Sequence, residues 1–105
     1  MKGFFMLAGT VLTHLDLKQL AGLCTKAGMK PVFDDGEFSI DEEATLTFRE
    51  GFDHELVLVG DAGDLEALQA LTQRISMILA GNKIAHAYEL YDPKNELVLE
   101  FDSEG

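Results

Sequence analysis

The sequence predicts an α+β two-layer sandwich in which two helices pack on one face of a mostly antiparallel sheet. Two observations lead to this prediction. Two segments carry apolar residues at three- and four-residue steps, and the extended segments around them are apolar on one side. Strands of that kind need a helical layer over a single face of their sheet. Because each helix lies between extended segments, we expect a ferredoxin-like (split βαβ) variant with an extra C-terminal hairpin.

Length and composition predict one globular domain. The chain has 105 residues, which is the usual size of a single domain, so we expect one domain over residues 1–105. Hydrophobic residues make up 47% of the sequence and charged residues 26%, which is enough to form a core. Disorder over most of the chain and a division into two domains are therefore not expected.

The first strand and the first helix follow from residues 4–28. Residues 4–11 are apolar and predict a strand that is buried, at least in part, on both faces. This run follows Lys2 as in a signal peptide, but residues 13–16 offer no small-residue cleavage site, so we interpret it as a strand. Asp16 is expected to cap a helix that ends at Gly28. The apolar stripe of this helix contains Leu17, Leu20, Ala21, Cys24 and Ala27.

The middle of the chain predicts four extended segments. Residues 30–33 and 37–40 are short strands on either side of a turn at residues 34–36. Residues 44–48 alternate strictly between apolar and polar, which is typical of a strand with one wet face. Residues 55–60 follow after a short loop and are expected to form a hairpin with them.

The second helix and the C-terminal hairpin complete the fold. Asp64 is expected to cap the longest helix and Gly81 to end it. Residues 84–91 and 96–101 flank a four-residue turn with Pro93. The apolar stripe of the helix contains Leu65, Leu68, Leu71, Ile75, Ile78 and Leu79, and the expected hairpin pairs are Leu90 with Leu97, Tyr88 with Leu99 and His86 with Phe101.

Common motifs of enzymes and ligand-binding proteins do not occur in the sequence. It contains no P-loop, no G-x-G-x-x-G, no G-x-S-x-G, no C-x-x-C and no H-E-x-x-H pattern. The strand-to-helix connection carries Asp61 and Asp64, which would repel a phosphate. We recognise no family signature in these residues. We therefore expect no cofactor, no metal and no catalytic residues.

The charge excludes some partners and favours others. The formal net charge is -11, which disfavours nucleic acid and an anionic membrane surface and favours a basic partner. No run of residues reaches the roughly 18 apolar residues of a membrane-spanning helix. The single cysteine, Cys24, cannot form an internal disulfide, so we expect a cytoplasmic protein. Its place on the apolar stripe of the first helix predicts an inert, buried thiol.

The strongest unusual feature is a concentration of acidic residues. Six of the ten residues at positions 34–43 are acidic. We interpret them as a docking surface for a basic protein, which Glu96, Glu100 and Asp102 could continue. A solvated loop that protects a sheet edge, or a divalent cation site, are the alternatives. The six residues, named here the acidic cluster, are Asp34, Asp35, Glu37, Asp41, Glu42 and Glu43.

The histidines give weaker signals. His54 lies between Asp53 and Glu55, and strand alternation places those carboxylates on the opposite face, so the three cannot hold one metal together without a bulge. His86 is expected in the core beside Tyr88. A metal site of three histidines would need His14, His54 and His86 to converge, which their spacing does not require.

Three functional hypotheses remain open at this stage. The first is a small, non-catalytic interaction domain of inhibitor, immunity or adaptor type that binds a basic protein. The second is a ferredoxin-like domain that binds a small ligand or regulates, and forms a homodimer. The third, an enzyme that uses His54 or His86 with a carboxylate, has the least support. Phe52 and Tyr91 are the aromatic residues most suited to an interface.

Overall fold

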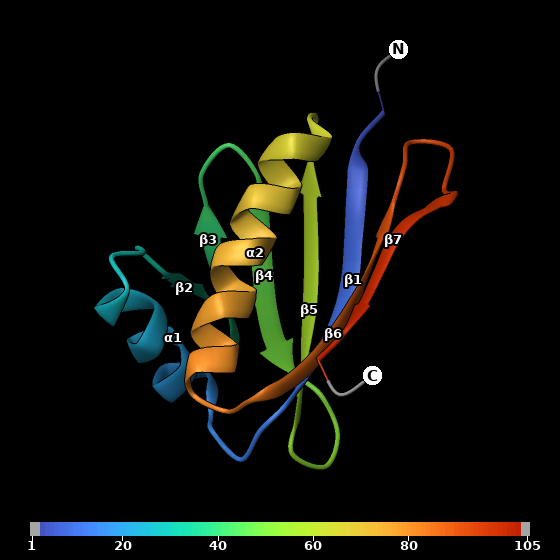
Figure 1. Ribbon diagram of the computed structural model, residues 1–105. Helices are drawn as coiled ribbons and strands as arrows, with labels where there is room; N and C mark the ends of the chain where they lie inside the picture. Colours follow the sequence, from blue (N-terminus) through green and yellow to red (C-terminus); the bar gives the residue numbers. More distant parts are fainter. Residues whose placement is uncertain (1–2, 104–105) are drawn as a thin grey trace.

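Within residues 3–103, which the computed structural model describes, the chain forms one seven-stranded antiparallel sheet and two helices (Figure 1). The strand order in the sheet is β2-β3-β4-β5-β1-β6-β7. Along the chain the elements are β1 (Phe5–Leu12), α1 (Leu17–Lys26), β2 (Val32–Asp34), β3 (Glu37–Asp41), β4 (Thr45–Glu50), β5 (Glu55–Ala62), α2 (Leu65–Gly81), β6 (Ala85–Tyr91) and β7 (Leu97–Asp102).

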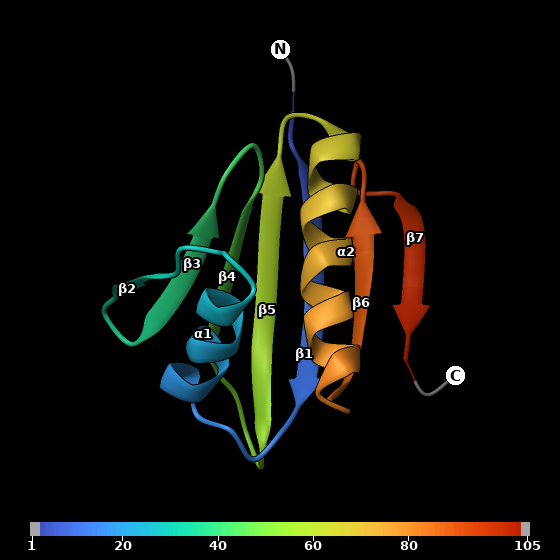
Figure 2. The ribbon, with the colours of Figure 1, turned by 60° about the vertical axis from the view of Figure 1, so that its left-hand side comes forward.

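Both helices lie on the same face of the sheet, and Figure 2 shows them side by side in front of the strands. The predicted α+β class, with two helices packed on an antiparallel sheet, is therefore confirmed. Strand β1 lies inside the sheet, between β5 and β6, whereas β2 and β7 form the two edges. Lys2, which precedes the apolar run in the sequence, lies outside the described residues. Neither helix of the described chain is long and apolar enough to cross a bilayer.

The first helix begins with a complete capping box. The Asp16 carboxylate accepts a hydrogen bond of 2.8 Å from the Gln19 backbone, and the Gln19 side chain accepts one of 3.0 Å from the Asp16 backbone. The helix ends before Gly28, whose φ of 92° favours glycine. Asp64 caps α2 in a similar way, since its side chain accepts from the Glu66 backbone at 3.2 Å.

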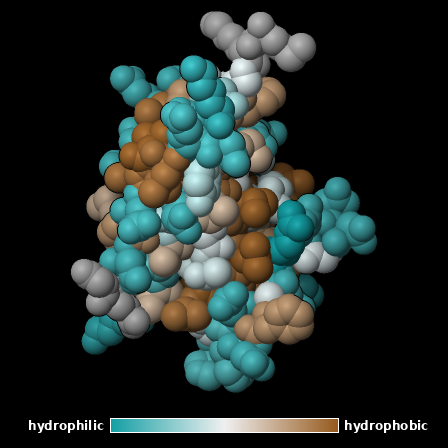
Figure 3. Space-filling view, turned by 90° about the vertical axis from the view of Figure 1, so that its right-hand side faces the viewer, coloured by the Kyte–Doolittle hydropathy of each residue, from teal (hydrophilic) through white to brown (hydrophobic). Residues whose placement is uncertain are grey.

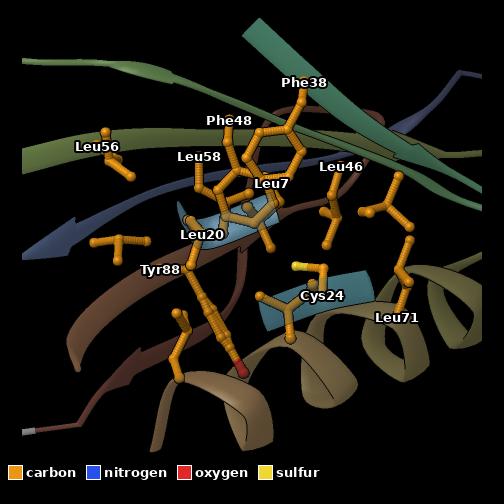
Figure 4. Packing of buried hydrophobic residues seen from close by; sticks show 14 of the residues in the cluster. Leu7, Leu20, Cys24, Phe38, Leu46, Phe48, Leu56, Leu58, Leu71 and Tyr88 are labelled. Atoms are coloured by element: carbon orange, nitrogen blue, oxygen red, sulfur yellow. The ribbon is translucent and has the colours of Figure 1, made fainter. Parts of the chain in front are cut away.

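The core lies between the helices and the sheet (Figure 4). Strand residues such as Leu7 and Phe48 alternate with more exposed ones, so one face of β1 and of β4 is buried. Phe38 and Phe48 stack directly across β3 and β4, with ring centroids 4.7 Å apart. From the other side, Leu68 and Ile75 of α2 complete the same cluster.

The C-terminal hairpin has a different register from the one expected. Tyr91 pairs with Leu97 and a bulge follows, so Leu90 pairs with Leu99 and Tyr88 with Phe101. The predicted pairs of Leu90 with Leu97, Tyr88 with Leu99 and His86 with Phe101 are therefore wrong. The turn is longer than predicted because the Asp92 carboxylate accepts from the backbone of Lys94 and Glu96, and Asn95 adopts a φ of 64°. Leu99 and Phe101 still share a face with Leu90 and Tyr88, whereas Leu97 now stands opposite Tyr91.

A close contact in the middle of the sheet yields a first prediction. A Cβ atom on Gly9 would lie 2.5 Å from the Ala87 carbonyl oxygen and 2.8 Å from the Tyr88 Cβ. Gly9→Ala should therefore lower the free energy of unfolding by about 1–3 kcal/mol, measured by urea denaturation. Gly22→Ala is the matched control: it lies in α1 with nothing within 4 Å, and should raise stability by about 0.5–1 kcal/mol. Equal effects at the two positions would contradict this account.

Candidate functional site

The acidic cluster lies on the hairpin formed by β2 and β3 and in the loop that leads to β4. Asp34 and Glu37 stand directly opposite each other across the two strands, so their side chains share a face of the sheet. Asp41 shares this face because it lies four residues after Glu37 in β3. The alternate residues Phe38 and Ile40 are buried under the helices. Three of the six acids therefore project from the side of the sheet that faces away from the helices.

The other three acids do not join this group. Asp35 occupies the turn with a φ of 48°, followed by Gly36 with a φ of 81°. Glu42 is directed toward α2, where its carboxylate accepts a hydrogen bond of 2.8 Å from the Arg74 guanidinium. Glu43 is exposed in the loop between β3 and β4. The structure thus separates this run of sequence neighbours: three acids share one face of the sheet, Glu42 contacts α2, and Asp35 and Glu43 lie in a turn and a loop.

Two cations, Arg49 and Arg74, lie beside the acidic cluster. Arg49 pairs with Glu37 across β3 and β4, at 3.6 Å between guanidinium and carboxylate. Glu37 and Arg49 are direct neighbours on one face of the paired strands, so their side chains can interact. The predicted hairpin joined residues 44–48 to 55–60 and did not pair β3 with β4, so the sequence did not indicate this ion pair. Arg74 lies 32 residues from Glu42 in the sequence, so no local pattern indicates that contact. Both pairs are partly exposed, and each contributes at most about 1 kcal/mol.

A second acidic group lies near the other edge of the sheet. Glu89 and Glu100 stand opposite each other on β6 and β7. The Tyr91 hydroxyl donates a hydrogen bond of 2.6 Å to Glu89. This hydrogen bond, together with the negative charges of Glu89 and Glu100, raises the pKa of the Tyr91 phenol. Glu100, which the sequence analysis considered as an extension of the acidic cluster, thus lies across the sheet from it.

The three histidines do not converge. The rings of His14 and His54 are in contact, with centroids 4.1 Å apart. They line an open depression of about 200 Å³ together with Asp16, Glu50 and Glu55. His86 lies elsewhere, on β6, and the described residues contain no group of three or more His, Cys, Asp or Glu side chains arranged to hold a metal ion.

His86 has hydrogen-bond partners on both ring nitrogens. Its Nδ1 lies 2.9 Å from the Ile84 carbonyl oxygen, which can only accept, so Nδ1 carries the proton. Its Nε2 then accepts from the Ser76 hydroxyl at 2.6 Å. A serine hydroxyl that is hydrogen-bonded to an imidazole is the arrangement of a catalytic nucleophile and its base. Here, however, His86 is only 6% exposed, and a backbone carbonyl takes the place of the carboxylate that orients the imidazole in such sites. The contact instead connects α2 to β6.

Cys24 is buried among the core residues of α1, as Figure 4 shows. Its side chain is 1% exposed. Burial raises the pKa of the Cys24 thiol to about 11, because the thiolate loses its hydration in the core. The thiol is therefore protonated and shielded at neutral pH, which disfavours a role as a nucleophile.

Comparison with known proteins identifies no relative of this chain. No family model matches the chain, no curated protein is detectably similar to it, and no solved structure is similar to the fold. Function must therefore be inferred from the residues themselves.

The bond between Ser76 and His86 yields a second prediction. Ser76→Ala removes the donor to a buried imidazole nitrogen, which then has no partner. We expect the free energy of unfolding to fall by about 1–3 kcal/mol. Thr25→Ala is a suitable control, because it removes a partly buried hydroxyl of α1 whose partner is a helix carbonyl that already accepts from the backbone. If urea denaturation shows that Ser76→Ala lowers the free energy of unfolding no more than Thr25→Ala does, the hydrogen bond between Ser76 and His86 does not stabilise the fold.

The raised pKa of Cys24 yields a third prediction. The unfolded thiol, with its ordinary value of 9.0, loses its proton at lower pH than the folded thiol at about 11. Stability from this group is therefore present below pH 9 and decreases as the pH rises toward 11. Cys24→Ala should flatten the decline of the free energy of unfolding across this window, while Tyr88 and Tyr91 act equally in both proteins. Parallel pH profiles for the two proteins would contradict the prediction.

Proposed function

We propose that this chain is a small, non-catalytic protein–protein interaction domain, of inhibitor, immunity or adaptor type, that binds a basic partner. The observation that carries the proposal is the projection of Asp34, Glu37 and Asp41 from one face of the β2–β3 hairpin, with Arg49 as the neighbouring cation. An exposed edge with this excess of negative charge attracts a basic surface and orients it during encounter.

The net charge of the chain, -11, also favours a basic partner. A chain with 19 acidic and 8 basic residues repels acidic molecules at long range and attracts basic ones. At physiological salt this attraction extends over about 8 Å, so it acts on encounter more than on the final complex. The free, buried Cys24 supports a location in the reducing cytoplasm.

A ferredoxin-like domain that binds a small ligand and forms a homodimer is the second candidate. Its support is the connection of the inner strands, which are ordered β4-β5-β1-β6. Helix α2 connects β5 to β6, with β1 between these two strands in the sheet. Helix α1 follows β1, and the chain passes through β2 and β3 before it reaches β4, on the other side of β5. Strands β2, β3 and β7 would then be additions to that core. The depression beside His14 and His54 would hold the ligand, and a compound that raises the melting temperature would favour this function.

Charge reversal tests the interaction domain. A tagged chain is first incubated with a lysate of the source cells at low salt, and the protein released by high salt is identified, purified and used in stopped-flow binding. Replacing Asp34, Glu37 and Asp41 by lysine should lower the association rate constant at least about tenfold at low salt. The dissociation rate constant should change less, because exposed charges at the margin of an interface act mainly on the association step.

A single substitution provides the matched control. Asp34→Lys and Glu66→Lys change the charge equally, but Glu66 lies in the first turn of α2, on the helical side of the sheet. Asp34→Lys should slow association several-fold, and Glu66→Lys should change it less than about twofold. A chain that captures no basic protein, or a triple lysine variant that associates normally at low salt, would rule the proposal out.

A further inference from the structure

One face of the sheet is left uncovered by the described residues. Both helices pack on the opposite face, and Figure 3 looks onto the uncovered side. We call it the open face. Hydrophobic and near-neutral residues lie down its middle, with hydrophilic residues around them (Figure 3). A sheet face of this extent requires either hydrophilic side chains or a partner.

The middle of the open face carries small, uncharged side chains. Across it, Ala8 pairs with Val59 and Thr10 pairs with Val57, so their side chains stand together. Adjacent strands continue this surface on both sides of β1 and β5. All of these side chains are short, and the longer side chains of Glu89 and Arg49 stand directly beside them, opposite Ala8 and Val57. The central strip, as we call this surface, consists of Ala8, Thr10, Thr47, Val57, Val59 and Ala87.

The sequence of β1 indicates that the central strip is normally covered. Residues Phe5–Leu12 are apolar on both faces of the strand, which is typical of strands that are buried on both sides. In the isolated chain only one of these faces is covered by helices. Met6 and Leu12, which share the open face with Ala8 and Thr10, remain 46% and 50% exposed. The pattern of β1 therefore fits a strand whose second cover is another molecule.

The charges around the central strip determine which molecule fits. Glu55 and Asp61 lie at the two ends of β5, Glu89 lies on β6, and Glu37 on β3 is paired with Arg49. A second copy of this chain would bring one acidic rim against another, which is unfavourable. A basic rim would instead be neutralised. Charge complementarity thus favours a basic protein over a homodimer.

The open face is also large enough for a stable complex. The two longer dimensions of the molecule are 39 and 30 Å. A face of these dimensions offers on the order of 1,000 Å², compared with about 800 Å² per partner in a standard interface. An apolar centre inside a polar rim is the usual composition of such interfaces.

We propose that the open face is the docking surface for the basic partner, which presents a flat patch of small or aliphatic side chains surrounded by Lys and Arg. This inference rests on the proposed function and extends it. The acidic cluster supplies one side of the rim, through Asp34, Glu37 and Asp41, and attracts the partner. The central strip supplies the contact that excludes water and retains the partner.

Attraction and retention can be separated by kinetics, since rim charges control association while buried contacts control dissociation. The probe is the basic protein that the tagged chain captures at low salt. The double variant Ala8→Gln with Val59→Gln keeps the charge and places two longer polar side chains on the central strip. We expect the dissociation rate to rise at least tenfold and the association rate to change less than about twofold. Met77→Gln, on the exposed side of α2, is the neutral control and should change neither rate.

Folding is checked by circular dichroism and thermal melting. If the double variant does not fold, Thr10→Gln with Ala87→Gln tests the same surface. If a glutamine double variant folds and its dissociation rate is unchanged, the open face is not the docking surface. The proposed function would still stand if the triple lysine variant associated more slowly than the wild-type chain. Capture of no basic protein would remove both. A wild-type chain that is dimeric by light scattering, and monomeric with the strip variant, would assign the open face to a second copy instead.

Discussion

The packing of both helices against one side of the sheet is the constraint on which the other features depend. Because strand residues alternate between faces, burial of Phe38 and Ile40 under the helices directs Glu37 and Asp41 to the opposite side. The same alternation places Ala8 and Thr10 on the uncovered side of β1. The hydrophobic effect on one face thus determines which polar and small residues the other face presents.

The helices, the strands and their two layers could be predicted from the sequence, whereas the strand order in the sheet and the register of the C-terminal hairpin could not. Asp16, Gly28 and Asp64 mark helix ends through local geometry, and strict alternation identifies residues 44–48 as a strand. Strand order depends on contacts between residues that are distant in the sequence, whereas the hairpin register depends on the local geometry of the turn. The five-residue connection after Tyr91, for example, results from several hydrogen bonds of Asp92 acting together.

The candidate site was predictable to a similar degree. Counting charges identified the acidic cluster, but neighbours in sequence are not neighbours on a face. Applying the two-residue period to β3 would have grouped Glu37 with Asp41 and separated them from Glu42. The contact of Glu42 with Arg74, and that of His14 with His54, are produced by the tertiary fold. No spacing in the sequence indicates either one.

The position of β1 has a consequence for how the chain reaches its native state. This strand is made before both of its neighbours in the sheet, β5 and β6, and α1, β2, β3 and β4 all lie between it and them in the sequence. During synthesis both edges of β1 stay unpaired until these later strands are made. Pairing strands that are far apart in the sequence is slow, because a long loop of chain must close. A nascent chain therefore exposes an unpaired apolar strand until β5 and β6 have been made, which is the period when a chaperone would be most useful to it.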